Sequence, residues 1–115
     1  MNTAIILCSG SGRRFKNQLP KQFVKLAGLP LLVHTLKAFQ NSPHIDDIII
    51  VTNPEFIEMT WGYVADFCLD RVAKVVCGGK TRQESSRIGI ECCPASTRYV
   101  LIHDGVRPFI CGNII

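Results

Sequence analysis

Short apolar runs alternate with amphipathic segments along this chain. The runs are typical of buried strands, and they fall at residues 4–8, 48–51, 72–76 and 100–102. Between them, apolar residues recur three or four positions apart, which is typical of helices that pack on one face. Helices are therefore expected over about residues 30–41, between Phe56 and Phe67, and over about residues 82–93.

Local signals support the boundaries of these helices. Pro30 suits the first turn of a helix, and the Asn-Ser-Pro sequence at 41–43 ends it. Gly62 weakens the second helix, because glycine has a low helix propensity. The residues of this helix that we expect to pack on its buried face are Phe56, Met59, Trp61, Tyr63 and Phe67.

The order of elements predicts the fold class. Strands that alternate with helices indicate an α/β, Rossmann-like domain with a mostly parallel sheet and helices on both faces. Ligands of such domains bind outside the carboxyl ends of the strands. Three segments then become candidate sites: the loop after residue 8, the Gly78-Gly79 turn, and the segment that follows Ile102.

Composition and charge narrow the class of partner. The chain has 115 residues, 47% of them hydrophobic, which is enough for one domain with its own core. The formal net charge of +4 is mild, and much of it is local. Five basic residues fall within a short segment: Arg13, Arg14, Lys16, Lys21 and Lys25. Such a local patch suits a small anionic ligand, and we expect no nucleic-acid partner.

The cysteines and the N-terminus point to a cytoplasmic protein. The 6 cysteines are scattered and form no Cys-x-x-Cys pair, so we expect buried free thiols in a reducing compartment. The apolar run at residues 4–8 is too short for a signal peptide or a membrane span. We therefore expect a soluble protein that does not associate with membranes.

The first candidate site is the loop after the first strand. Its characteristic residues are Gly10, Gly12, Arg13, Arg14 and Lys21. Glycines expose backbone N–H groups that can bind phosphates, and fixed cations stabilise charge that builds on phosphorus. Phe15 replaces the third glycine of a dinucleotide fingerprint, and the Gly-Lys-Ser/Thr ending of a P-loop is absent. On spacing alone, a tight turn followed by a solvated basic stretch explains this loop equally well.

The second candidate is the Gly-Gly-Lys-Thr-Arg-Gln-Glu-Ser-Ser sequence at 78–86. A glycine turn that enters a helix lets a base or ribose approach the backbone, and Ser85 can form a hydrogen bond. Taken alone, an ordinary strand-to-helix turn is the simpler interpretation.

The third candidate is the His-Asp-Gly-Val-Arg-Pro sequence at 103–108. Asp104 follows a hydrophobic strand, where a phosphate-bound Mg²⁺ needs a hard oxygen ligand. Arg107 can pair with a phosphate in bidentate fashion. The alternative is a salt bridge between Asp104 and Arg107 that shapes a turn. His103 is expected to be structural.

Taken together, these segments resemble the cytidylyltransferases that act on sugar-alcohol phosphates. This is the family of 2-C-methyl-D-erythritol 4-phosphate cytidylyltransferase, with ribitol-5-phosphate cytidylyltransferase as a close relative. The resemblance rests on four segments in register, at residues 6–14, 20–23, 78–85 and 103–109. It implies a fold of the nucleotide-diphospho-sugar transferase type, transfer of CMP from CTP to a polyol phosphate, and release of pyrophosphate.

The resemblance also implies roles for individual residues. Nucleotide contacts are expected from Cys8, Ser9, Gly10, Gly12, Gly79 and Ser85. Arg14 and Lys21 would be catalytic and stabilise the pentacoordinate phosphorus. Asp104 would bind Mg²⁺, and Arg107 the phosphate of the acceptor. The family's domain is considerably longer than 115 residues, so residues 1–115 are expected to be the N-terminal part of one domain, with a homodimer in the full-length form.

Two other hypotheses remain at this point. The chain could be a truncated CTP-binding module without activity, or a nicotinamide-dependent oxidoreductase. The second predicts an acid at the end of the second strand, where Thr52 and Asn53 stand instead. As the acceptor we expect methylerythritol phosphate ahead of ribitol phosphate, although little in this sequence separates the two.

Overall fold

A computed structural model describes residues 1–8, 14–15, 19–20, 25–26 and 29–104 of the chain. Side chains are described for residues 1–8 and 30–104. Cα atoms of the whole chain have a radius of gyration of 13.0 Å, which is typical of a domain of about 100 residues.

Four parallel strands form the central sheet. These are β1 (Asn2–Leu7), β6 (Asp47–Thr52), β7 (Val72–Cys77) and β8 (Tyr99–Asp104). Their spatial order is β7-β6-β1-β8, and every pair of neighbours runs parallel. The predicted strands and the α/β class are therefore confirmed. The last strand is longer than expected and includes Asp104 as its final residue.

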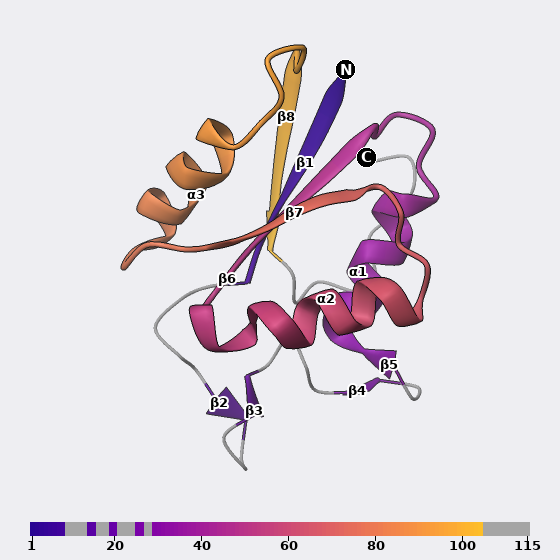
Figure 1. Ribbon diagram of the computed structural model, residues 1–115, viewed down its shortest axis with the longest axis vertical. Coiled ribbons are helices and arrows are strands. Elements are labelled where there is room, and N and C mark those ends of the chain that lie inside the picture. Colours follow the sequence, from indigo (N-terminus) through magenta and orange to yellow (C-terminus); the bar gives the residue numbers. More distant parts are fainter. Residues whose placement is uncertain (9–13, 16–18, 21–24, 27–28, 105–115) are drawn as a thin grey trace.

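In the part of the chain that the structure describes, three helices cover the two faces of this sheet. They are α1 (Leu31–Gln40), α2 (Ile57–Asp66), which follows the short helix η2 (Pro54–Phe56), and α3 (Arg82–Glu91). Helices α1 and α2 lie on one side of the strands and α3 lies on the other (Figure 1). All three predicted helices are confirmed, and helices on both faces are confirmed with them.

Two small antiparallel pairs precede α1 in the described part of the chain, where the sequence predicted no strand. Strand β2 (Arg14–Phe15) pairs with β3 (Leu19–Pro20), and β4 (Lys25–Leu26) pairs with β5 (Leu29–Pro30). Each strand has only two residues, which is too short to produce an alternating pattern that sequence reading could detect.

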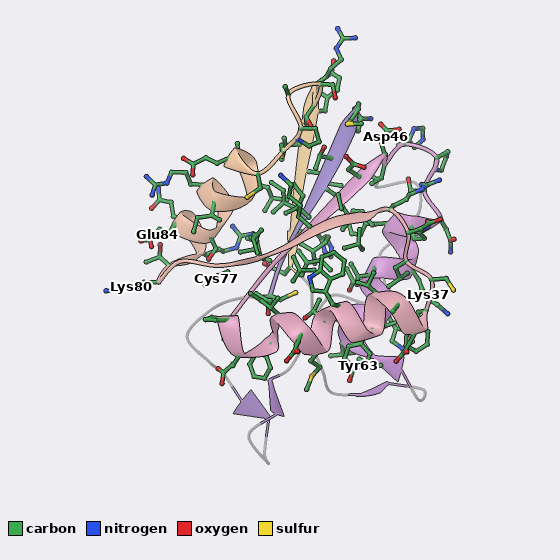
Figure 2. All side chains as sticks on the ribbon, in the orientation of Figure 1. Lys37, Asp46, Tyr63, Cys77, Lys80 and Glu84 are labelled. Carbon is green, nitrogen blue, oxygen red and sulfur yellow. The ribbon has the colours of Figure 1, made fainter. Side chains whose placement is uncertain are left out.

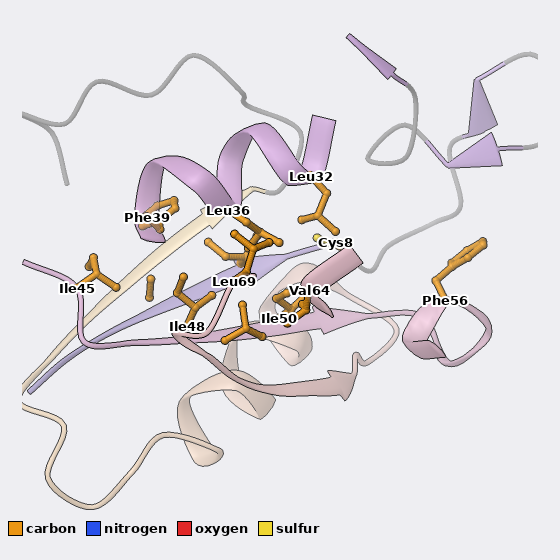
Figure 3. Close-up of a cluster of buried hydrophobic side chains, with 13 residues drawn as sticks. Cys8, Leu32, Leu36, Phe39, Ile45, Ile48, Ile50, Phe56, Val64 and Leu69 are labelled. Atoms are coloured by element: carbon orange, nitrogen blue, oxygen red, sulfur yellow. The ribbon is translucent and has the colours of Figure 1, made fainter. Parts of the chain in front are cut away.

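The larger part of the core lies between the sheet and α1 with α2. Leu32, Leu36 and Phe39 of α1 pack over Ile6 and Ile50, and all five are completely buried. Figure 3 shows Cys8 beside Leu32, at the end of this layer. Because the apolar residues of α1 lie three or four positions apart, the helix buries a single face.

The buried face of α2 differs from the expectation. Met59 and Trp61 are each 41% exposed, whereas Thr60 and Val64 are buried. Tyr63 and Phe67 pack against the core as expected. The hydroxyl of Thr60 donates a hydrogen bond of 2.7 Å to the backbone oxygen of Phe56. That bond satisfies the hydroxyl, so the polar residue can take a buried position.

The cysteines are less buried than predicted. The five described cysteines are free thiols, but only Cys8 is buried. Cys68 and Cys77 are exposed, and Cys92 and Cys93 are half-buried. Cys77 follows Val76 in the apolar sequence of β7, yet this strand lies at one edge of the sheet among the described strands, so its last side chain reaches solvent.

Helix α3 approaches the opposite face of the sheet unusually closely. Ile5, Leu7, Ile49 and Val51 form the buried layer on that face. A Cβ atom built on Gly89 would lie 2.6 Å from Cγ2 of Ile5, which is far inside van der Waals contact. Only glycine therefore allows the helix to lie this close.

We expect Gly89→Ala to destabilise the protein, because the added methyl group forces α3 away from Ile5. Overpacking of this kind costs about 1–3 kcal/mol. Denaturant unfolding of the purified protein measures the loss.

Gly62→Ala is the matched control. Gly62 lies in α2 with nothing within 4 Å of its built Cβ, so alanine should stabilise by about 0.5–1 kcal/mol through helix propensity. Equal effects of the two substitutions would contradict the close packing of α3.

Candidate functional site

The strand order places a topological switch point between β1 and β8. From β1 the chain moves outward through β6 to β7, and it then returns to the other side of β1 to form β8. In open α/β sheets, ligands bind at the carboxyl ends of the two strands where the order reverses. Leu7 and Asp104, the last residues of β1 and β8, are paired in the parallel register. The candidate site therefore lies at Asp104 and the segment after Leu7.

Cys8 is a buried residue next to the candidate site and not a reactive group. Its backbone N–H donates to the oxygen of Val51 at 2.7 Å, so this amide is engaged in the sheet. Burial, with a further contribution from the charge of Asp104, raises the pKa of the Cys8 thiol to about 12. The thiol is neutral at physiological pH and does not serve as a nucleophile.

The Gly78-Gly79-Lys80 turn uses its own amides internally. The N–H of Gly78 donates to the oxygen of Thr52 at 2.8 Å. That of Gly79 donates to Oγ of Ser85 at 3.0 Å, and that of Lys80 to Oε1 of Glu84 at 3.2 Å. Figure 2 shows Lys80 and Glu84 together near the start of α3, with Cys77 close by. Because these donors are already engaged, the turn does not present them to a phosphate.

The start of α3 holds this turn in place. Thr81 caps the helix, and its Oγ1 accepts a hydrogen bond of 3.0 Å from the N–H of Glu84. The Glu84 side chain reaches back to Lys80, in an arrangement close to a capping box. A Cβ atom on Gly79 would lie 2.7 Å from Cβ of Glu84, so Gly79 is required by close approach. The Thr-x-x-Glu spacing at 81–84 is a signal for this cap that the sequence analysis missed.

Ser85 is a buried residue that links the helix to the turn. It is 1% exposed, and its Oγ accepts the Gly79 amide. The two residues predicted to contact the nucleotide from this segment are therefore in direct contact with each other.

Asp104 is paired with Arg82, a residue to which the sequence analysis gave no role. The Nε atom of Arg82 lies 3.4 Å from Oδ1 of Asp104, and the two side chains are 65% and 34% exposed. Arg82 is the first residue of α3, so this contact joins the second and third candidate segments. The sequence analysis had considered Arg107 as the partner of Asp104, but Arg107 lies outside the described residues.

The Asp104 carboxylate fits a divalent cation that also binds phosphates. It is a hard oxygen donor, partly exposed at the carboxyl edge of the sheet. Within the described residues, no group of three or more His, Cys, Asp and Glu side chains could hold a metal. Mg²⁺ commonly uses one or two carboxylates and takes its other ligands from phosphates and water, so a single acid here suffices.

His103 packs against the core, and its structural role stays a prediction. Its ring packs edge-on against Phe39, with ring centroids 5.3 Å apart. Neighbouring side chains of a strand point to opposite faces, so His103 faces α1 while Asp104 faces α3.

Several predicted site residues cannot be placed. Arg14 lies in β2, but its side chain is not described. Ser9, Gly10, Gly12, Lys21 and Arg107 lie outside the described residues. The structure thus brings together Cys8 with Asp104, and Gly79 with Ser85, and it leaves the phosphate-facing residues as predictions.

Among the described residues, no helix is both long and apolar enough to cross a membrane.

The sequence matches a known family along almost its whole length. Residues 2–115 match the model of the 2-C-methyl-D-erythritol 4-phosphate cytidylyltransferase (IspD) family. A curated relative of that name from Lachnospira eligens is 44% identical over 115 residues, which cover 100% of this chain and 50% of the relative. Another, from Clostridium novyi, is 43% identical over 119 residues that cover 99% of this chain and 49% of the relative.

A solved structure supports the same assignment. The crystal structure of 4-diphosphocytidyl-2C-methyl-D-erythritol synthase from Anaerococcus prevotii superimposes with a TM-score of 0.81 and 27% identity. The match covers 98% of this chain and 46% of that protein. The chain therefore spans about half the length of the relatives it matches. On the family match and these identities, the chain belongs to the 2-C-methyl-D-erythritol 4-phosphate cytidylyltransferase family.

Proposed function

We propose that residues 1–115 are the N-terminal part of a cytidylyltransferase domain that transfers CMP from CTP to 2-C-methyl-D-erythritol 4-phosphate. The observation that carries this proposal is the family match over residues 2–115. The position of Asp104 at the β1–β8 switch point adds independent physical support.

Two loops would divide the recognition of CTP. The amides of Gly78, Gly79 and Lys80 are engaged within the turn, so we expect this turn to contact the base through its carbonyl oxygens. Such acceptors suit the amino group of cytosine. The phosphates would then bind the segment after Cys8, where Ser9, Gly10 and Gly12 would supply backbone amides and Arg14 and Lys21 would supply positive charge.

Asp104 would hold Mg²⁺ together with the phosphate oxygens of CTP. The ion would neutralise charge on the triphosphate and orient it for attack. Arg107 would bind the phosphate of the acceptor through its guanidinium group.

The chemistry needs no general base from this chain. An oxygen of the acceptor phosphate, already anionic, attacks the α-phosphorus of CTP, and the bond to the β-phosphate oxygen breaks as pyrophosphate leaves. The neutral thiol of Cys8 takes no part. Arg14 and Lys21 would stabilise the charge that builds on the phosphorus during this step.

The proposal extends to the acceptor, the assembly of the whole protein and the activity of residues 1–115. Ribitol 5-phosphate is the alternative acceptor. The whole protein is expected to be a cytoplasmic homodimer. Because this chain spans about half of its relatives, residues 1–115 alone could bind CTP without turning it over.

The function is tested by pyrophosphate release from CTP and Mg²⁺, with the full-length protein and each acceptor in turn. We expect release with methylerythritol phosphate and little or none with ribitol 5-phosphate. If pyrophosphate is released with neither acceptor, the proposed reaction is rejected. Calorimetric titration of CTP into residues 1–115 would show separately whether this part binds the nucleotide.

Removing either proposed catalytic cation should lower kcat more than CTP affinity. Loss of one transition-state charge typically costs about 2–4 kcal/mol, so Arg14→Ala and Lys21→Ala should each slow turnover by roughly 30-fold or more. Lys25→Ala, which removes a nearby charge with no assigned role, is the control and should change little. Equal losses in CTP binding and rate would argue against these roles.

Ser85→Ala should loosen the turn that is proposed to hold the cytosine. The part-buried N–H of Gly79 would lose its acceptor, which costs about 1 kcal/mol, and the Kd for CTP should rise. Ser86→Ala, one position along the same helix, should leave both stability and affinity near those of the wild type. Unfolding curves and CTP titrations of the two variants measure the difference, and identical behaviour would remove Ser85 from the site.

A further inference from the structure

The contact between Arg82 and Asp104 connects two segments that are distant in sequence. Arg82 is the first residue of α3, and Asp104 is the last residue of β8. Their side chains meet at 3.4 Å, Nε to Oδ1. The question is whether this ion pair supports the fold or the site.

The fold brings the two residues to the same place. Ile102 packs on the α3 face of the sheet, and Asp104, two residues later, projects from the same face. Helix α3 begins just after the end of β7, at the carboxyl edge, and Gly89 holds it close to Ile5. The first turn of α3 is therefore next to the final residue of β8.

The stability of the fold does not account for Arg82. Its side chain is 65% exposed and that of Asp104 is 34% exposed, and ion pairs so accessible to water contribute little to stability. The first turn of a helix also disfavours a cation, because the helix dipole is positive there. Glu84 and Thr81 already provide the stabilising groups of that turn.

The same arrangement is favourable if the Asp104 carboxylate binds a metal ion. The guanidinium of Arg82, at the start of α3, contacts the Asp104 carboxylate and favours one orientation of that side chain. A metal ligand benefits from such an outer partner, which fixes its orientation before the ion arrives.

We propose that Arg82 is a positioning residue that orients the Asp104 carboxylate toward the divalent cation bound with the nucleotide. This inference rests on the proposed function, since Asp104 is the proposed metal ligand there. Arg82 acts through Asp104 and does not contact the nucleotide in this role.

The experiment measures Mn²⁺ affinity of the full-length protein in the presence of a non-hydrolysable CTP analogue, by electron paramagnetic resonance. Arg82→Met keeps the length of the side chain but removes its charge and its hydrogen bonds. We expect it to weaken Mn²⁺ binding by about tenfold or more, as is typical of outer-shell partners. Asp104→Asn should weaken binding further, and Arg82→Lys should recover part of the loss.

Arg87→Met is the matched control, because Arg87 is an exposed arginine of the same helix. It removes the same charge five positions further along the helix, and Mn²⁺ affinity should stay at the wild-type value. The melting temperature of every variant should be unchanged, so that a loss of metal affinity does not reflect unfolding.

The outcomes separate the inference from the function it rests on. Unchanged or tighter Mn²⁺ binding in Arg82→Met would overturn the positioning role. Tighter binding is the result expected if the Arg82 guanidinium only competes with the metal ion for Asp104. Weaker binding of the CTP analogue without metal would also overturn it, by making Arg82 a nucleotide contact. If Asp104→Asn binds Mn²⁺ normally, the metal assignment and this inference fail together. Loss of Mn²⁺ affinity in a protein that releases no pyrophosphate would reject the reaction alone.

Discussion

The parallel pairing of β1 with β8 is the constraint on which the rest of the site depends. It sets Leu7 opposite Asp104 and so brings the segment after the first strand to the same edge as the acid of the last. Because successive side chains of a strand alternate between faces, a shift of one residue would turn Asp104 toward α1 and His103 toward α3. The apolar residues of β1, buried on both faces, fix that register.

The close approach of α3 is the second constraint. Gly89 allows this helix to contact Ile5 directly, and Gly79 allows the preceding turn to contact Glu84. The two glycines therefore have structural roles that need no ligand to explain them. Their effect on function is indirect, because they determine where the first turn of α3, with Arg82 and Ser85, meets the carboxyl edge of the sheet.

Sequence patterns predicted the layers well and the side-chain contacts poorly. Hydrophobic periodicity located each main strand and helix, since burial leaves a repeating signal in the chain. It failed at Trp61 and Met59, which are exposed, because apolar residues ring most of α2 and spacing alone does not choose its buried side. It also missed the pairing of Arg82 with Asp104, which depends on how α3 and β8 meet in space.

The backbone amides of the Gly78-Gly79-Lys80 turn are engaged, and this limits which part of a nucleotide the turn can bind. A glycine-rich turn at a helix start is usually read as a phosphate site, because its N–H groups point outward. Here the three N–H groups donate to Thr52, Ser85 and Glu84 instead. The Glu84 carboxylate accepts the amide of Lys80, as a bound anion would. The phosphates of a nucleotide would then bind elsewhere, and the place we propose is the basic, glycine-containing segment that follows Cys8 in the sequence. We therefore expect the Gly78-Gly79-Lys80 turn to contact the base and the segment after Cys8 to bind the phosphates, with Asp104 next to Leu7 at the carboxyl edge of the sheet.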